Sequence, residues 1–304
     1  MVNHELSILG SSSALPTSQR FSSAQILRIF ERFFLIDCGE GTQIQLRRMK
    51  MPFNKIRAVF ISHLHGDHYL GIFGVLSSFN MLGRTAPLTI YSPKGLEQLV
   101  RMQLQFVEKS LSFDLRFVEI PNEERVELYV DKKVVVRAFK LNHRIPCFAF
   151  EFSHNTTERN IKKECISLYN LSLSEIARIK SGGDLILEGG QRIENDKLTY
   201  IKQPVSFLYV TDTRYKPSLA DIITMPPTLL YHEATFDADL EKRARETYHS
   251  TAIEAAQFAS LVQAQHLIIG HFSARYHSVE KLVLQARELF PNTDAAEDLQ
   301  TFTF

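Results

Sequence analysis

The hydrophobic residues of this chain form short apolar runs that alternate with stretches of helical apolar spacing. Short apolar runs bounded by glycine, serine or charged residues predict β-strands, and apolar residues three or four positions apart predict amphipathic helices. The predicted strands are 4–9, 24–30, 33–37, 57–62, 88–91, 134–139, 147–152, 205–210, 228–231 and 265–269, and the predicted helices are 42–49, 70–82, 95–107, 172–180, one beginning near Thr251, and 278–289. This rhythm predicts an α/β fold.

The pattern is interrupted once, by a polar segment from residue 153 to about residue 203. This segment is rich in Lys, Glu and Asn and contains Gly182-Gly183 and Gly189-Gly190. We interpret residues 1–304 as a single domain that carries an inserted arm at 153–203. Such an insertion is either a tolerated surface elaboration or a functional arm.

Polar residues whose side chains can bind a metal ion or transfer a proton follow several of the predicted strands. Asp212, His232, Glu233 and His271 each come directly after an apolar run, as His63 does. Polar residues at repeated strand ends are expected to meet at one rim of a sheet. Because both halves of the chain supply them, we expect a core of two sheets built from two similar halves.

The densest group is the run His63-Leu64-His65-Gly66-Asp67-His68. His63 and His65 are two residues apart, so an extended backbone points both side chains the same way and lets them share one ion. Gly66 permits a turn, after which Asp67 and His68 suit a second ion. Ligands without cysteine favour a catalytic centre that keeps water on the metal. The run predicts a hydrolytic, binuclear metal centre.

Composition restricts the class of protein and the cellular compartment that we expect. The chain has 304 residues, 44% hydrophobic, which is enough for a large core. Cys38, Cys147 and Cys165 are odd in number and widely spaced, which fits a reducing compartment. The first residues show no secretory signal, and no apolar run is long enough to span a membrane. We therefore expect a cytoplasmic protein without a membrane partner.

Net charge alone does not indicate a nucleic-acid partner, because the formal charge is only +1. Charge is nevertheless uneven: residues 41–66 contain no Asp or Glu but five Lys and Arg, at positions 47, 48, 50, 55 and 57. A basic stretch that leads into the metal run suits a polyanionic substrate. A solvated basic helix face is an equally good explanation at this stage.

The run at 63–68 resembles the His-x-His-x-Asp-His signature of the metallo-β-lactamase superfamily. Within it, the chain resembles the ribonuclease Z family of tRNA 3′-processing endonucleases, from about residue 5 to about residue 300 apart from the 153–203 segment. The segments that carry this likeness are Leu35-Ile36-Asp37-Cys38-Gly39-Glu40-Gly41-Thr42-Gln43, His232-Glu233-Ala234-Thr235-Phe236, His249-Ser250-Thr251 and His271-Phe272-Ser273-Ala274-Arg275-Tyr276.

The resemblance implies a four-layer αββα sandwich and a site with two Zn²⁺ per subunit, with Mn²⁺ as an alternative metal. It assigns one zinc to His63, His65 and His143, the other to Asp67, His68 and His271, and a bridging role to Asp212. It also makes Asp67 the general base and His249, held by Glu233, the proton donor to the departing 3′ oxygen. The residues alone leave His143 ambiguous, because a lone histidine between strands is more often a hydrogen-bonded loop residue.

The function that follows is zinc-dependent hydrolysis of precursor tRNA on the 3′ side of the discriminator base. The products are a tRNA 3′-hydroxyl and a 5′-phosphorylated trailer, and the resemblance also implies a homodimer. The arm stands where bacterial members carry an exosite that grips the tRNA elbow, although it lacks their Gly-Pro-rich tip and offers Lys162, Lys163, Arg178 and Lys180 among acidic residues.

Other functions remain open to different degrees. The main alternative is a binuclear-zinc hydrolase of small phosphodiesters or sulfate esters, which would be indifferent to structured RNA. A glyoxalase II-like thioesterase would leave the segments at 232–236 and 249–251 unexplained, and a secreted β-lactamase would need a signal peptide. A non-catalytic RNA-binding relative would be expected to have lost metal ligands, whereas all seven are present.

Overall fold

The computed structural model describes residues 4–106, 111–154, 159–201 and 204–304. Two compact units are present: Met1–Ser153 together with Ser206–Phe304, and His154–Val205. The last residue of the predicted helix at 95–107, and residues 155–158 and 202–203 of the predicted arm, lie outside the described residues. No helix among the described residues is long and apolar enough to cross a membrane.

The first unit contains two seven-stranded sheets. In spatial order, the first sheet consists of β20 (Thr301–Thr303), β1 (Glu5–Gly10), β3 (Ala24–Ile29), β4 (Arg32–Ile36), β5 (Ile56–Phe60), β6 (Leu88–Ser92) and β7 (Leu115–Glu119). Strands β20 to β4 are antiparallel, and β4 to β7 are parallel. Its outer face packs against α1 (Thr42–Arg48), α3 (Ile72–Met81) and α4 (Leu96–Leu104).

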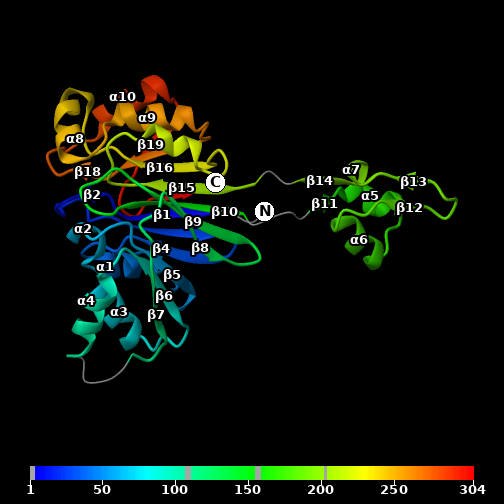
Figure 1. Ribbon diagram of the computed structural model, residues 1–304, viewed down its shortest axis with the longest axis horizontal. Helices are drawn as coiled ribbons and strands as arrows, with labels where there is room; N and C mark the ends of the chain where they lie inside the picture. Colours follow the sequence, from blue (N-terminus) through cyan, green and yellow to red (C-terminus); the bar gives the residue numbers. More distant parts are fainter. Residues whose placement is uncertain (1–3, 107–110, 155–158, 202–203) are drawn as a thin grey trace. The chain divides into compact units, whose positions relative to one another are not determined.

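The second sheet lies against the inner face of the first (Figure 1). It consists, in spatial order, of β19 (Thr293–Ala295), β17 (Leu267–Gly270), β16 (Leu229–Glu233), β15 (Ser206–Val210), β10 (Phe148–His154), β9 (Val134–Lys140) and β8 (Arg125–Val130). Helices α9 (Ala252–Leu261) and α10 (Glu280–Leu289) cover its outer face.

Aromatic side chains fill the space between the two sheets. The ring centroid of Phe60 lies 5.5 Å from that of Phe150 and 5.3 Å from that of Phe152, and Phe34 lies 5.4 Å from Phe152. The neighbouring residue Val59 instead packs on the helix side, because successive side chains of a strand point to opposite faces. The predicted four-layer αββα arrangement is therefore confirmed.

Several helices and strands were not predicted because their residues show no clear apolar pattern. The edge strands β7 and β8, and the short strands β19 and β20, contain alternating polar residues rather than apolar runs. Helices α2 (Gly66–Tyr69) and α8 (Glu241–Thr247), and the paired strands β2 (Ser12–Ser13) and β18 (Phe272–Ser273), are too short for a periodic signal. The described residues of this unit also include the 3₁₀ helices Phe53–Lys55, Pro217–Asp221 and Ala238–Leu240.

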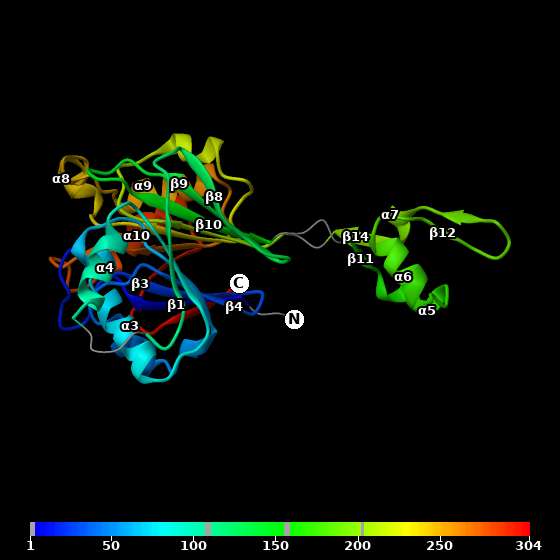
Figure 2. The same ribbon diagram turned by 60° about the horizontal axis from the view of Figure 1, so that its bottom comes forward.

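The second unit has a small hydrophobic core of its own. Its elements are β11 (Arg159–Ile161), α5 (Lys163–Leu168), α6 (Leu173–Lys180), β12 (Leu185–Ile186), β13 (Arg192–Ile193), α7 (Asn195–Leu198) and β14 (Thr199–Ile201). Helix α6 lies beside β11 (Figure 2) and contributes Ile179 to a cluster with Cys165 and Leu198. The predicted helix at 172–180 is present, and Ser172 and Glu175 form a capping box at its start.

Candidate metal centre

The polar residues at the strand ends meet at one edge of the second sheet. Strands β15, β16 and β17 are parallel and in register, so their carboxyl ends lie side by side and deliver Asp212, Glu233 and His271 to the same edge. Strand β5 of the facing sheet ends at Phe60 and leads into His63. His143 joins them from the connection between β9 and β10.

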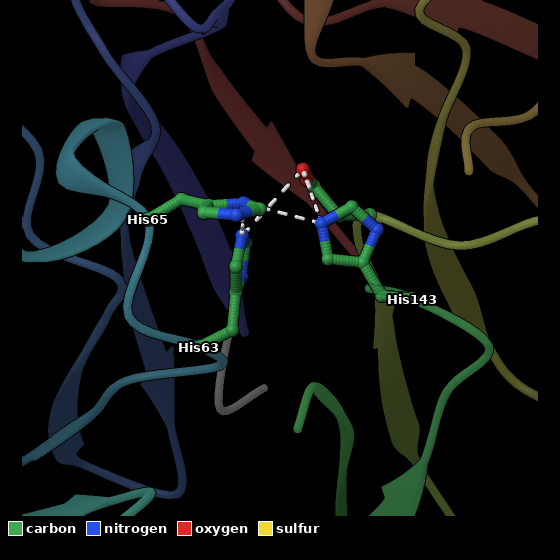
Figure 3. A group of neighbouring side chains, drawn as sticks. His63, His65 and His143 are labelled. Atoms are coloured by element: carbon green, nitrogen blue, oxygen red, sulfur yellow. Dashed lines mark hydrogen bonds and ion pairs between the residues drawn. The ribbon is translucent and has the colours of Figure 1, made fainter. Parts of the chain in front are cut away.

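One group of side chains is made of His63, His65, His143 and Asp212, whose potential ligand atoms all lie within 4.8 Å of one another. Figure 3 shows the three imidazole rings pointing toward a common centre. His65 Nδ1 lies 3.0 Å from His63 Nε2 and 3.1 Å from His143 Nε2. Asp212 Oδ2 lies 3.6 Å from His63 Nε2 and 3.8 Å from His143 Nε2.

A second group consists of Asp67, His68 and His271. The Nε2 atoms of the two histidines are 3.2 Å apart, and each is 3.5 Å from Asp67 Oδ2. The other oxygen of Asp212, Oδ1, lies 3.3 Å from His68 Nε2 and 3.1 Å from His271 Nε2. The Asp212 carboxylate thus faces one group with each oxygen, which is the geometry of a bridging ligand.

The far side of each ring indicates which nitrogen carries a proton. His143 Nδ1 lies 3.1 Å from the carbonyl oxygen of Tyr248, which can only accept. His68 Nδ1 lies 2.8 Å from Asp37 Oδ2. Both rings therefore donate from Nδ1 and present the Nε2 lone pair to the site, as metal-binding histidines commonly do.

Two hydroxyl groups impose the same arrangement on His63 and His271. Ser62 Oγ donates to Asp37 Oδ2 at 2.9 Å, so it accepts from His63 Nδ1 at 3.0 Å. Thr235 Oγ1 donates to Glu233 Oε2 at 2.6 Å, so it accepts from His271 Nδ1 at 3.0 Å. Each hydroxyl has a single proton, which it donates to a carboxylate, so it can only accept a hydrogen bond from the imidazole.

The spacing of these ligand atoms fits divalent metal ions. Ligands arranged as a tetrahedron around an ion at about 2.0–2.1 Å lie about 3.3 Å from one another. The separations given above run from 3.0 to 3.8 Å, and all the potential ligand atoms of each group lie within 4.8 Å of one another. Imidazole nitrogen and carboxylate oxygen are ligands that zinc accepts, and manganese also accepts carboxylate. Both groups therefore have the ligand types and spacing to hold a divalent cation.

The electrostatics of the groups support that fit. Burial lowers the pKa of His63, His65 and His143, which keeps these rings neutral. Burial alone would raise the pKa of the Asp67 and Asp212 carboxyls, but the surrounding imidazoles outweigh it and lower both pKa values.

His68 is affected in the opposite direction. Burial would lower the pKa of this ring, yet the carboxylates of Asp67, Asp212 and Asp37 raise the pKa well above its ordinary value. The three carboxylates therefore attract positive charge to the position of His68, and a metal cation bound there would be stabilised by the same attraction.

The side chains of His249 and Glu233 form a pair beside the two groups. His249 Nδ1 is 3.0 Å from Glu233 Oε1, and the Glu233 side chain is fully buried. Burial would lower the pKa of His249, but the Glu233 carboxylate outweighs it and raises the pKa of His249 to about 9. The His249 imidazole is consequently charged near neutral pH, and its Nδ1 is engaged with Glu233.

The groups open into a cleft of about 530 Å³. The lining residues are Ser13, Ala14, Leu15, Pro16, Ser22, Glu40, His65, Gly66, Asp67, Leu70, His143, Arg144, Asp212, Thr247 and His249. A larger cavity of about 650 Å³ lies between Arg20, Val279 and Asp298 and contains no member of either group. The larger volume of this cavity is therefore no reason to regard it as the functional site.

The wall formed by residues 11–22 is held from the other end of the chain. Asp298 accepts hydrogen bonds from Ser11 Oγ at 2.8 Å and from the Phe21 backbone N–H at 2.7 Å. Within this segment the Ala14 backbone N–H donates to Asp67 Oδ2 at 2.7 Å. Asp298 thus fixes the loop that contacts Asp67.

All seven predicted ligands and the predicted pair Glu233 and His249 lie in this one region. Prediction missed the residues behind them: Asp37, Ser62 and Thr235. Asp37 follows strand β4 directly, so the rule that selected Asp212 and His271 could have selected it. No pattern in the sequence indicates that Ser62 and Thr235 contact histidines.

Solved structures with the same architecture include human tRNase Z, short form, which is 26% identical, covers 98% of each chain and has a TM-score of 0.71. The metallo-β-lactamase fold protein YhfI from Bacillus subtilis is 18% identical over 100% of both chains, with a TM-score of 0.69. The fold and the site together define a metallo-β-lactamase fold protein.

A family model described as "Anti-Pycsar protein Apyc1" matches residues 4–161, just over half of the chain. Ribonuclease Z of Bacteroides thetaiotaomicron is 42% identical over 100% of this chain and 96% of its own. Ribonuclease Z of Porphyromonas gingivalis strain W83 is 37% identical, covering 98% of each. The chain belongs to the family that this model describes and, over its whole length, to the ribonuclease Z family. The predicted enzyme class, a metal-dependent phosphodiester hydrolase, is thereby confirmed.

We expect Asp37→Asn to weaken metal binding by about 10- to 100-fold, because Asp37 orients His68 and, through Ser62, His63. Competition with a chromogenic chelator would measure the affinity. Asp114→Asn, which alters an exposed carboxylate on the protein surface, is the matched control. Equal affinity in the Asp37 variant and the wild type would contradict the orienting role.

Proposed function

We propose that this chain is a zinc-dependent endoribonuclease that cleaves precursor tRNA on the 3′ side of the discriminator base. The observation that carries the proposal is the shared carboxylate of Asp212, which faces two adjacent ligand groups, in a chain similar over its whole length to proteins named ribonuclease Z. Hydrolysis leaves a 3′-hydroxyl on the tRNA and a 5′-phosphate on the trailer.

His63, His65 and His143 would hold one Zn²⁺ and Asp67, His68 and His271 the other, with Asp212 between them; Mn²⁺ is an alternative. When bound, such ions supply Lewis acidity for attack of water on phosphorus and for the charge that develops on the phosphate oxygens. Water then replaces the RNA 2′-hydroxyl as nucleophile.

In this proposal Asp67 accepts the proton of the attacking water. Its side chain lines the cleft and is only 10% exposed. The lowered pKa of this carboxyl keeps it ionised, so its oxygen atoms can accept a hydrogen bond from the attacking water. The hydrogen bond from the Ala14 N–H fixes the carboxylate on the cleft side.

In this proposal His249 protonates the departing oxygen. Glu233 holds its Nδ1, which leaves Nε2 for a donor role in the cleft. As the bond between phosphorus and the 3′ oxygen breaks, the proton moves from His249 to that oxygen, and the electron pair of the bond stays with it. The proton released by water goes to Asp67, so the reaction is balanced.

Incubation with a 3′-extended precursor tRNA, with and without a chelator, tests the function. We expect one new 3′ end, at the discriminator base, and complete loss of cleavage with the chelator. Asp67→Ala should also abolish cleavage while its circular dichroism spectrum stays that of the wild type. Near wild-type cleavage by the purified variant would remove Asp67 from the mechanism.

Another result would favour the main alternative. Rapid turnover of bis(p-nitrophenyl) phosphate combined with no cleavage of structured RNA would identify a hydrolase of small phosphodiesters.

We expect His249→Ala to slow cleavage by about 100-fold or more, because the leaving oxygen loses its proton donor. Bound metal per chain, measured by elemental analysis, should remain that of the wild type. His266→Ala is the matched control, since His266 pairs with Asp294 away from the cleft. A loss of metal large enough to explain the slower rate would refute the donor role.

We also propose that the unit His154–Val205 binds the tRNA and that the enzyme works as a homodimer. Seven Lys and Arg residues stand within 159–201, against six Asp and Glu residues. Several of these charges are paired, for example Arg192 with Asp184. Phosphate contacts made by the remaining basic residues would weaken with salt.

Residues 155–204 can be replaced by Asn-Gly to test the arm. Ser153 pairs with Ser206, and the His154 N–H donates to the Val205 carbonyl at 3.1 Å, so a two-residue hairpin turn can join β10 to β15. We expect the KM for precursor tRNA to rise by at least about 10-fold, while small-substrate hydrolysis persists. Unchanged tRNA affinity would show that the arm is not an exosite.

A further inference from the structure

The aromatic ring of Tyr248 lies close to two arginine side chains, Arg144 and Arg214, beside the metal centre. The guanidinium carbon of Arg214 lies 3.6 Å from the centroid of the Tyr248 ring, and that of Arg144 lies 5.7 Å from it. Both distances are within the range of cation–π attraction. Arg144 directly follows His143 and lines the same cleft as His65 and His249.

Backbone carbonyls at the end of α8 hold both guanidinium groups. Arg144 Nη2 donates to the Glu246 carbonyl at 3.1 Å, and Arg214 Nε donates to the Arg245 carbonyl at 2.6 Å. The C-terminal end of a helix is partially negative, so it attracts such cations. A guanidinium has five N–H donors, and Arg144 is exposed and lines the cleft, so donors other than the one held by Glu246 are available to a ligand there.

Tyr248 also links this stack to the metal centre. It ends α8 with a left-handed backbone, at φ 64°. Its carbonyl oxygen accepts from His143 Nδ1, and the next residue is His249. The same turn therefore orients a ligand, the proton donor and the support of Arg144.

The two arginines differ from many others in the chain because their charge is not neutralised. Among the residues that the structure describes, no carboxylate lies within 4.0 Å of Arg144 or Arg214. By contrast, Arg245 pairs with Glu241, and Arg116 pairs with Asp114. A guanidinium that keeps its charge beside a phosphodiesterase cleft has the chemistry to bind a further phosphate, since its planar donors match phosphate oxygens.

We propose that Arg144 binds a phosphate of the RNA chain other than the one being cleaved, and that Tyr248 and Arg214 position it. This inference rests on the proposed function. A small phosphodiester has a single phosphate, which occupies the metal centre and leaves Arg144 without a partner. Arg144 thus selects polynucleotides over small esters, because phosphate contacts fix the position of a nucleic acid on a protein.

The test compares two substrates of the intact enzyme, a 3′-extended precursor tRNA and bis(p-nitrophenyl) phosphate. For Arg144→Ala, we expect kcat/KM for the tRNA to fall about 10-fold more than for the small ester, mainly through KM. The slope of log KM against log salt should decrease by about 0.7, the value of one phosphate contact. Arg144→Lys should recover part of the loss, because it keeps the charge without the planar donors.

Arg116→Ala is the control, because it removes another exposed arginine, on edge strand β7, and both substrates should react as with the wild type. Equal losses for both substrates in Arg144→Ala would show that Arg144 acts only through His143, and no loss for either would show that it binds nothing; each result overturns the proposal. Failure of the wild type to cleave the tRNA would instead refute the proposed function and is seen before any variant is made.

Discussion

The site depends on the mutual repulsion of ligand atoms that the fold forces together. Four imidazole Nε2 atoms, the Nδ1 of His65 and the carboxylates of Asp67 and Asp212 point into one small volume. Hydrogen bonds fix the Nδ1 protons of four rings on the far side, so these rings cannot turn away without leaving buried donors unpaired. A cation between these ligand atoms would remove their mutual repulsion. This explains why so many ligand atoms can be held together at one edge of the sheet.

The polar residues behind the ligands connect functions that look separate in the sequence. Asp37 contacts His68 and Ser62, and it also accepts from the Tyr209 hydroxyl at 2.7 Å, so the aromatic core and both ligand groups share one carboxylate. Thr235 contacts Glu233 and His271 at once. The pair of Glu233 and His249 and the residues of the two candidate ligand groups are therefore parts of one hydrogen-bonded network, and they are positioned together.

Sequence patterns were sufficient for the parts of the fold that are buried on both faces. Strands β5, β15, β16 and β17 consist mainly of apolar residues, and a polar residue of the site lies at the end of each strand or shortly after it. The edge strands β7 and β8 are half exposed, so their alternating residues gave no apolar run. His143 stands in a loop, and its proximity to His65 arises from the pairing of β9, β10 and β15, which no local pattern contains. The core of the second unit was also hidden, because its few apolar residues are spread over a polar segment.

The hydrogen bonds from the loop at 11–22 to Asp298 imply an order in which the cleft is assembled. Strand β20 pairs with β1, and β19 pairs with β17, so the segment that follows α10 completes both sheets as well as the cleft wall beside Asp67. During synthesis on the ribosome this segment emerges after all seven predicted ligand residues, the last of which is His271. The chain therefore carries every ligand of the site before it can complete the wall of the cleft, and the cleft is finished only after residues 293–304 leave the exit tunnel.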